Sequence, residues 1–187
     1  MSTKQKIMRS AAALFVERGV AESTTRLIAE KAGFAEGTIY RHFESKEALA
    51  WQIFEQQHRD LARALQSTVD QEDGLFNQVQ AMVRCFYTLA DEDWLLFSYY
   101  LSMQHVYVRV IDTEESTPYS VILAVVQSAI DQKVIRQRDA NVLASLAMGA
   151  VQQLAINKIY GRYQGALLEH VEDVVQAIWF ILSEGKG

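Results

Sequence analysis

Apolar residues recur every three or four positions along most of the chain, which is the spacing that gives an α-helix one buried face. Near the N-terminus, Ile7, Ala11, Leu14 and Phe15 follow this spacing, and Gly19 supplies a stop signal. Runs that alternate apolar and polar residues, the pattern of a β-strand, are almost absent. The pattern therefore predicts an all-α fold.

Capping residues and glycines divide this pattern into about nine helices. Ser2, with Gln5 three residues later, can cap the first helix. Ser23 and Thr24 offer caps for a second short helix, which ends at Gly33. The expected helices that follow cover about 37–43, a long stretch from Ser45, 74–90, 93–110, a segment that starts at Pro118, 139–160 and 167–184.

The last two expected helices differ from the others in how much of their surface is apolar. The segment "ANVLASLAMGAVQQLAINKIY" is apolar nearly all round, so it needs cover on both sides. The final segment carries a broad apolar stripe that includes Val171, Val175 and Ile178. A homodimer in which residues 139–160 and 167–184 of two copies form a four-helix interface supplies that cover. The alternative is that 139–160 is the central helix of a monomer.

Composition limits the class of protein. Half of the 187 residues are apolar, enough for one substantial core or for a small domain joined to a larger one. The single cysteine, Cys85, cannot form an internal disulfide, which suits a reducing compartment. The N-terminus lacks the apolar core of a signal peptide, and no continuous apolar stretch approaches the roughly 18 to 20 residues that span a bilayer. We therefore expect a cytoplasmic protein without a membrane segment.

The formal net charge of −5 is unevenly distributed. Residues 1–46 hold eight Lys or Arg against five Asp or Glu, whereas residues 47–187 hold ten against eighteen. A basic end on an acidic body is the asymmetry expected when only that end approaches phosphate. The charge therefore separates a basic part at 1–46 from an acidic part at 47–187, and an excess of three positive charges does not by itself establish a function.

Residues 24–43, "TTRLIAEKAGFAEGTIYRHF", have the layout of a helix-turn-helix, two short helices joined by a sharp turn at Gly33. The apolar side chains expected to hold the two helices together are Ile28, Ala29, Ala32, Ile39 and Phe43. The polar side chains expected to face outward are Thr38, Tyr40, Arg41 and His42. Bulky hydrogen-bond donors on a short exposed helix suit the base edges and phosphates of a major groove.

The stretch "TTRLIAEKAGFAEGTIYRHFESKEAL" resembles the N-terminal signature of the TetR family of bacterial transcriptional repressors. The matching features are Thr-Thr, Ile-Ala, Ala-Gly, Gly-Thr, an aliphatic-Tyr pair, a closing aromatic residue and Ser-Lys-Glu, in this order. The resemblance implies about nine helices, an N-terminal three-helix DNA-binding domain, a homodimer that binds double-stranded operator DNA, and a variable C-terminal domain that binds an inducer.

The resemblance also implies roles for particular residues. Thr25, Tyr40 and Lys46 match positions that commonly touch phosphate in the family. Thr38 and His42 match positions on the recognition helix that face DNA. A different reading of Tyr40 makes it partly a core residue, in which case its phenol needs a partner.

Further positions match with less agreement. Arg26 stands where some members of the family use an arginine on a base, and Gly37 matches a glycine that lets the backbone approach the duplex. Arg41 is either a direct DNA contact or a solvated surface residue. Two positions depart from the family pattern. Ala35 cannot cap the recognition helix, and Glu36 adds negative charge near the duplex unless it accepts from a cytosine amino group.

Aromatic residues and methionine are concentrated between residues 84 and 127, where they could line a cavity for a small, largely apolar or aromatic inducer. The candidates for ligand contact are Cys85, Phe86, Trp94, Phe97, Tyr100, Met103, Gln104 and Tyr107, with Gln127, Gln153 and Asn157 as further polar contributors. An aromatic stripe at helical spacing is also what an ordinary core requires. Both interpretations fit the pattern.

The sequence thus favours a ligand-responsive DNA-binding regulator, a repressor released from its operator by an inducer. We expect a helix-turn-helix DNA-binding domain at 1–46 and a helical ligand-binding and dimerisation domain at 47–187. The Gly-x-Ser-x-Gly, phosphate-loop and His-Glu-x-x-His motifs of common enzymes do not occur. His42 has no second ligand at suitable spacing, so we expect no metal site and no cofactor. The alternative is a helical small-molecule-binding protein or an enzyme that keeps the N-terminal fold without specific DNA binding.

Overall fold

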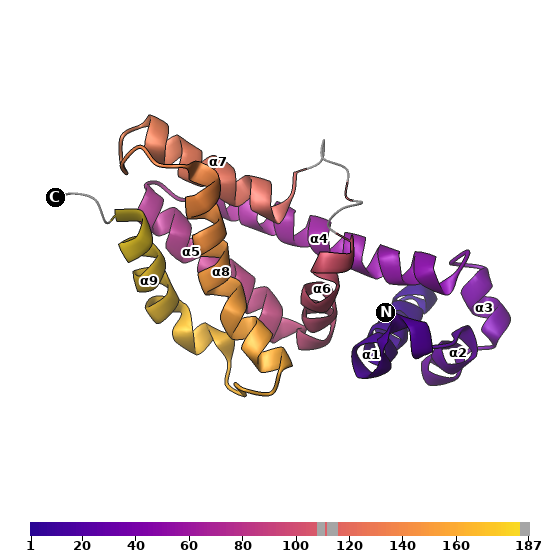
Figure 1. The fold of residues 1–187 in the computed structure, drawn as a ribbon. Helices are drawn as coiled ribbons and strands as arrows, with labels where there is room; N and C mark the ends of the chain where they lie inside the picture. The colour runs from indigo at the N-terminus through magenta and orange to yellow at the C-terminus, as the bar shows by residue number, and fades with distance from the viewer. Residues whose placement is uncertain (108–110, 112–115, 184–187) are drawn as a thin grey trace. The chain divides into compact units, whose positions relative to one another are not determined.

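The structure is a computed structural model that describes residues 1–107, 111 and 116–183. These residues form nine α-helices and one short 3-10 helix, and they contain no β-strand, so the all-α prediction is confirmed. The elements, labelled as in Figure 1, are α1 (Thr3–Glu22), α2 (Thr25–Ala32), α3 (Glu36–Tyr40), α4 (Lys46–Val69), α5 (Leu75–Glu92), α6 (Trp94–Tyr107), α7 (Pro118–Asp131), α8 (Ala140–Ile159), η2 (Leu167–His170) and α9 (Val171–Ser183).

The expected helix positions agree closely with these bounds. The helix expected at 139–160 is α8, and the one expected at 167–184 is the segment η2 with α9. Residues 108–110, expected at the end of the sixth helix, and residue 184 lie outside the described residues.

Two compact units make up the chain, and neither is continuous in sequence. The first comprises Met1–His58 together with residues 93–112, and the second comprises Arg59–Glu92 together with residues 113–187. Helix α4 supplies residues to both units, because the division falls after His58. The functional boundary expected at residue 46 concerns DNA binding and stays a prediction.

Helix α1 begins with the predicted cap. The amide of Gln5 donates to Oγ of Ser2 at 3.2 Å, and the amide of Ser2 donates to Oε1 of Gln5 at 2.8 Å. The expected stop at Gly19 interrupts the helix rather than ending it, since Gly19 has φ 82° and the chain resumes a helical path to Glu22. The hydroxyl of Ser23 donates to the Gly19 carbonyl at 2.8 Å, which ties this last turn to the bend.

The core of the first unit joins α1, α4 and α6. The rings of Phe15 on α1 and Tyr99 on α6 lie 5.8 Å apart, and the Tyr99 hydroxyl donates to the Ala50 carbonyl on α4 at 2.8 Å. Tyr99 is 1% exposed, so this hydrogen bond satisfies a phenol that water cannot reach. Burial raises the pKa of Tyr99 above its ordinary value. The domain that carries the N-terminal helices therefore depends on a helix that the chain reaches only after residue 93.

The second unit packs α5, α7, α8 and α9 together (Figure 1). The Tyr87 hydroxyl on α5 donates to the Val151 carbonyl on α8 at 3.1 Å. The carboxylate of Asp91, at the end of α5, accepts from Nζ of Lys158 at 3.3 Å and from the Leu168 amide at 3.0 Å. One acidic side chain thus joins α5 to α8 and to η2.

Helix α8 is apolar on two sides, as the sequence predicts. Leu143 and Ala144 are fully buried inside the second unit, whereas Val142 is 51% and Leu146 46% exposed. By length and composition alone, α8 is also apolar enough to cross a membrane. Core helices of soluble proteins pass the same test of length and composition, so the finding is weak evidence for a membrane span.

Candidate DNA-binding surface and ligand cavity

The sharp turn between α2 and α3 is built from local signals. Oγ1 of Thr24 accepts from the Leu27 amide at 3.2 Å and caps α2. Gly33 ends α2 in the left-handed conformation, with φ 75° and ψ 32°. The Phe34 amide then donates back to the Ala29 carbonyl at 2.9 Å, so the chain reverses without unpaired backbone groups at this point.

The apolar residues expected to hold α2 and α3 together are buried. Ile28 and Ile39 have no exposed surface, Ala29 is 2% exposed and Phe43 is 4% exposed, while Ala32 is half-buried. The helix-turn-helix arrangement predicted from the sequence is therefore the geometry that the structure shows.

Helix α3 is shorter than expected. It covers Glu36–Tyr40 rather than about 37–43. The amides of His42 and Phe43 both donate to the Ile39 carbonyl at 2.9 Å, which tightens the chain into a turn. At its other end Ala35 provides no side-chain cap, as the sequence indicated.

Three of the four side chains expected to face outward do so. Tyr40 is 56% exposed, and Arg41 and His42 are exposed. Thr38, in contrast, is only 8% exposed, which corrects the expectation that it faces outward. The physical reason is local: Nη2 of Arg41, one turn later, donates to Oγ1 of Thr38 at 3.1 Å. The role of Thr38 toward DNA stays a prediction.

Lys46 lies at the start of α4 and is half-buried. Its ammonium donates to the Ala21 carbonyl at 3.1 Å and lies 3.8 Å from the Glu47 carboxylate. An ammonium group has three hydrogens to donate, so this arrangement leaves donor capacity for a phosphate. The contact with Ala21 holds the cation near the end of α1.

Arg26 and Gly37 are both exposed. A Cβ added at Gly37 meets nothing within 4 Å, so no packing inside the chain requires a glycine there. That position is open for the approach of another molecule.

Three side chains from α2 and α3 form a chain of hydrogen bonds on this exposed surface. The Thr25 hydroxyl donates to Oε1 of Glu36 at 2.5 Å. Oγ1 of Thr25 also lies 3.2 Å from the Tyr40 phenol oxygen. Thr25 thus contacts both Tyr40, the other of these residues expected to touch phosphate, and Glu36, the one acidic residue of the recognition helix. Spacing in the sequence gave no sign of this connection.

The second unit holds a narrow apolar cavity of about 50 Å³. Its walls come from α4, α5, α7, α8 and α9, and Gln152 is the one polar residue among the described residues that line it. Representative wall residues are Leu61, Leu65, Val83, Phe86, Val126 and Ile178. The arrangement suits an uncharged, slender apolar group.

The ligand residues expected from the sequence are divided between the two units. Phe86 lines the cavity. The expected residues on α6, all in the first unit, are Trp94, Phe97, Tyr100, Met103, Gln104 and Tyr107. Contact of these α6 residues with a ligand stays a prediction.

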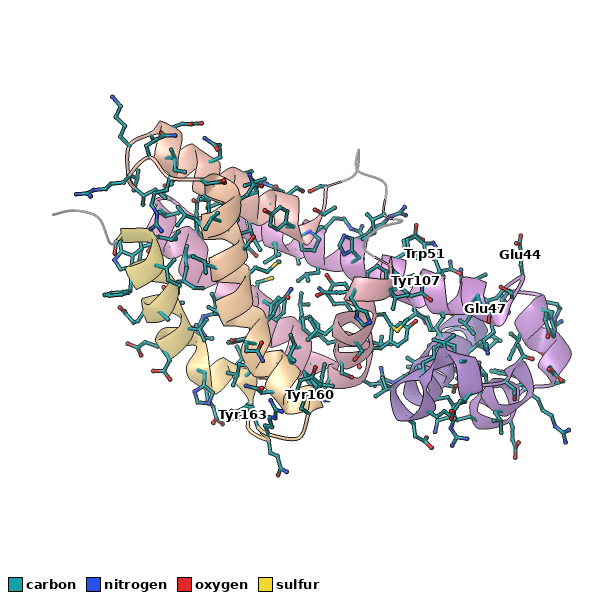
Figure 2. All side chains as sticks on the ribbon, viewed as in Figure 1. Glu44, Glu47, Trp51, Tyr107, Tyr160 and Tyr163 are labelled. Carbon is teal, nitrogen blue, oxygen red and sulfur yellow. The ribbon has the colours of Figure 1, made fainter. Side chains whose placement is uncertain are left out.

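The α6 rings pack into a closed aromatic cluster with α4. The Phe54 ring on α4 lies 5.4 Å from Tyr100 and 5.2 Å from Tyr107. Figure 2 shows Trp51 and Tyr107, whose rings meet edge to face at 5.4 Å. Burial raises the pKa of Tyr100 to about 12, although its hydrogen bond with Gln104 acts in the opposite direction.

The remaining expected ligand residues lie in the second unit without converging on the cavity. Gln127 is exposed and donates to Asp131 at 2.8 Å, and Gln153 donates to Asn157 at 3.4 Å. Burial raises the pKa of the Cys85 thiol, while a hydrogen bond with Thr68 lowers it and the Glu92 charge raises it further.

Comparisons with known proteins bear on both sites. A family model described as bacterial regulatory proteins, tetR family, matches residues 7–53. The transcriptional repressor KstR2 of Mycobacterium tuberculosis (strain ATCC 25618 / H37Rv) is 32% identical over 82 residues, which are 40% of this chain and 41% of that repressor. The matched part therefore spans about two fifths of the length of this relative.

Solved structures resemble the chain over nearly its whole length. The regulator FadR from Bacillus subtilis, in complex with stearoyl-CoA, superimposes with a TM-score of 0.74 at 15% identity, over 93% of this chain and 96% of that one. The complex of SmeT with triclosan gives a TM-score of 0.74 at 19% identity, over 99% and 94%. At such identities the likeness concerns the fold.

Proposed function

The chain belongs to the tetR family of bacterial regulatory proteins, and on this premise we propose that it is a DNA-binding transcriptional regulator, a repressor released from its operator by a small apolar molecule. The observation that carries this proposal is the helix-turn-helix at residues 24–43, whose outer surface presents Arg26, Tyr40, Arg41 and His42. Side chains of these types suit base edges and the flanking phosphates of a major groove.

Two copies are needed for operator binding in this proposal. The half-exposed Val142 and Leu146 on α8, together with Phe180 on α9 at 61% exposure, form an apolar surface that a second copy can cover. The dimer forms through residues 139–160 and 167–184. It presents two helix-turn-helix units to successive major grooves, about 34 Å apart. Sedimentation measurements on the wild type and on Leu146→Glu test this: the variant should be monomeric, and a monomeric wild type would contradict the dimer.

The apolar cavity is the proposed inducer site. Its volume of about 50 Å³ is well below the roughly 300–1,000 Å³ of ligand pockets, so an inducer has to widen it. Met82 and Met148, flexible side chains in its wall, are suited to rearrangement. The stearoyl-CoA and triclosan complexes of FadR and SmeT are ligands of those proteins. They support an inducer with a long or flat apolar part.

Widening the cavity provides the coupling between ligand and DNA. Leu61 and Leu65 of α4 line the cavity, and α4 begins in the unit that carries the helix-turn-helix. A ligand that displaces these side chains binds the released form more tightly than the DNA-bound form, as population shift requires. A coupling of about 1 to 3 kcal/mol lowers operator affinity about 5- to 150-fold.

The decisive experiment is selection of bound fragments from random duplex DNA, followed by mobility shift of the selected duplex with and without decanoic acid or triclosan as probe ligands. Specific binding supports the regulator. If no duplex is bound above a scrambled control while a probe ligand binds the cavity, the chain is instead a helical small-molecule-binding protein. Catalytic activity is no part of the proposal.

A salt titration tests the phosphate contact assigned to Lys46. Lys46→Ala should weaken binding to all duplexes and reduce the slope of log affinity against log salt by about 1. Lys133→Ala, which removes an exposed cation of the second unit, serves as the control. An unchanged slope for Lys46→Ala would remove Lys46 from the phosphate contacts.

A further inference from the structure

The hydrogen bonds among Thr25, Glu36 and Tyr40 have a direction that follows from counting hydrogens. A hydroxyl carries one hydrogen, and that of Thr25 is donated to the Glu36 carboxylate at 2.5 Å. At the 3.2 Å contact with Tyr40, Thr25 can therefore only accept, so the phenol donates. The order of donation is Tyr40 to Thr25 to Glu36.

This order leaves neither hydroxyl with a free hydrogen. Phosphate oxygens accept hydrogen bonds, so Thr25 and Tyr40 can donate to a phosphate only after the chain of bonds opens. Glu36 holds the chain closed, and its negative charge also repels a nearby phosphate. In the free protein Glu36 therefore opposes the two contacts expected from Thr25 and Tyr40.

A donor that draws the Glu36 carboxylate away from Thr25 favours the open state. Glu36 is exposed on α3, and the base-edge group that suits a carboxylate in the major groove is the cytosine N4 amino group. When that amino group draws the Glu36 carboxylate away, Thr25 regains its hydrogen and can donate it to Tyr40, which reverses this hydrogen bond and frees the phenol hydrogen. A hydroxyl of this pair can then donate to the adjacent phosphate, and both can do so once the bond between them opens.

We propose that Glu36 is a specificity-determining residue that makes the phosphate contacts of Thr25 and Tyr40 conditional on a cytosine in the operator. The inference rests on the proposed function, because it requires that α3 enters a major groove. It differs from ordinary base reading in that a wrong base loses more than its own hydrogen bond: the two phosphate contacts are lost with it.

The first test compares affinities for the selected operator and for a scrambled duplex at fixed salt. Glu36→Ala should bind the scrambled duplex roughly 3- to 10-fold more tightly than the wild type and lose discrimination at one C·G pair. Glu30→Ala removes the same charge from α2, away from the three bonded side chains, and should give a smaller gain on the scrambled duplex. If both variants gain the same affinity for the scrambled duplex, Glu36 acts through its charge alone, and the proposal is overturned.

A double-mutant cycle tests the coupling itself. In the wild-type background, Tyr40→Phe should cost roughly 3- to 10-fold on the operator and clearly less on the scrambled duplex. In the Glu36→Ala background the same change should cost equally on both duplexes. A Tyr40→Phe loss that does not depend on the duplex in the wild-type background would show that the phenol is already free, against the proposal.

A third test asks whether Glu36→Gln changes the base that the protein prefers. Because a glutamine amide pairs with adenine through N6 and N7, this variant should prefer adenine where the wild type prefers cytosine. All variants are at exposed positions, and their thermal unfolding should match that of the wild type. If the wild type binds no duplex selectively, the proposed function fails. If it binds selectively but Glu36 variants keep the same base preference and an additive cycle, only the coupling fails.

Discussion

The interiors of the two units are built from different side chains, and the difference determines where the cavity lies. In the first unit, rings from α4 and α6 fill the space between the helices, and polar atoms such as the Tyr99 hydroxyl find backbone partners. In the second unit, mostly aliphatic side chains from five helices, together with the Phe86 ring, line a narrow cavity. The ring cluster of Phe54, Tyr100 and Tyr107 thus lies in the unit that does not hold the apolar cavity.

The packing chemistry explains this contrast. Flat rings meet in offset or edge-to-face pairs that fill volume with few gaps, and each ring buries a large area. The side chains of the five helices around the cavity leave a void, and the atoms that line it lack dispersion contacts on that side. The most aromatic segment of a sequence is therefore a poor guide to the position of a ligand cavity.

The largest expected effect comes from removing a ring of the closed cluster. Phe54 has no exposed surface, so Phe54→Ala should lower the free energy of unfolding by about 3–5 kcal/mol. Leu61→Ala, in the cavity wall, should cost about 2–3 kcal/mol because part of its surroundings is already empty. Urea unfolding of both variants measures the difference. A larger loss for Leu61→Ala would reverse the comparison.

Alkaline pH should destabilise the first unit through its buried tyrosines. Because burial raises the pKa of Tyr100 to about 12 from its ordinary value near 10, the folded state favours the neutral phenol. The stability that this provides is complete below about pH 10 and declines as pH rises through about 12, with a loss of up to about 3 kcal/mol.

Unfolding followed between pH 8 and pH 12 measures this loss. Tyr100→Phe removes the group that titrates and should flatten the pH dependence relative to the wild type. A steeper decline in the variant would mean that Tyr100 is not responsible.

Substitutions that enlarge a buried alanine should cost more stability in the first unit than at the cavity of the second unit. Ala50 has no exposed surface and lies beside the Tyr99 hydroxyl, so Ala50→Leu should destabilise by about 1–3 kcal/mol. Ala147 lines the cavity, so Ala147→Leu should cost less than about 1 kcal/mol and block a probe ligand such as decanoic acid. Calorimetry gives both the stability and the loss of binding. Unchanged ligand binding in Ala147→Leu would place the ligand elsewhere.

The smallest effect concerns Cys85 in the second unit. Burial raises the pKa of its thiol, the hydrogen bond with Thr68 only partly opposes this, and the Glu92 charge adds to it. The thiolate fraction at pH 7 should therefore lie below that of a free cysteine, and alkylation by iodoacetamide should be slower than that of glutathione. Faster alkylation would indicate a reactive thiol.

Local features of the fold could be predicted from the sequence, because their causes are local. The cap at Ser2 and the turn at Gly33 depend on residues a few positions apart, and the burial of Ile28 and Ile39 follows the apolar spacing within the helix-turn-helix. Whether Thr38 is buried or exposed depends on where the Arg41 side chain lies, and the spacing of residues along a helix does not give that position.

The cavity could not be located from the sequence for a similar reason. Leu61, Leu65 and Val126 follow the same apolar spacing as core residues, and nothing in that spacing separates a wall from an interior. Which unit a helix joins is likewise decided by contacts between distant segments. The sequence grouped the α6 rings with Phe86, whereas the structure places them in different units.

The interleaving of the two units has a consequence for how the protein is made. During synthesis, α1, α2, α3 and α4 leave the ribosome well before α6. The Ala50 carbonyl and the Phe15 ring therefore lack their partner Tyr99 until α6 emerges. The unit that carries the helix-turn-helix therefore cannot complete its interior until α6, which begins at Trp94, has been synthesised and has left the exit tunnel. A nascent chain stalled at residue 92 should remain sensitive to protease in α1, whereas one stalled after α6 has emerged should be protected.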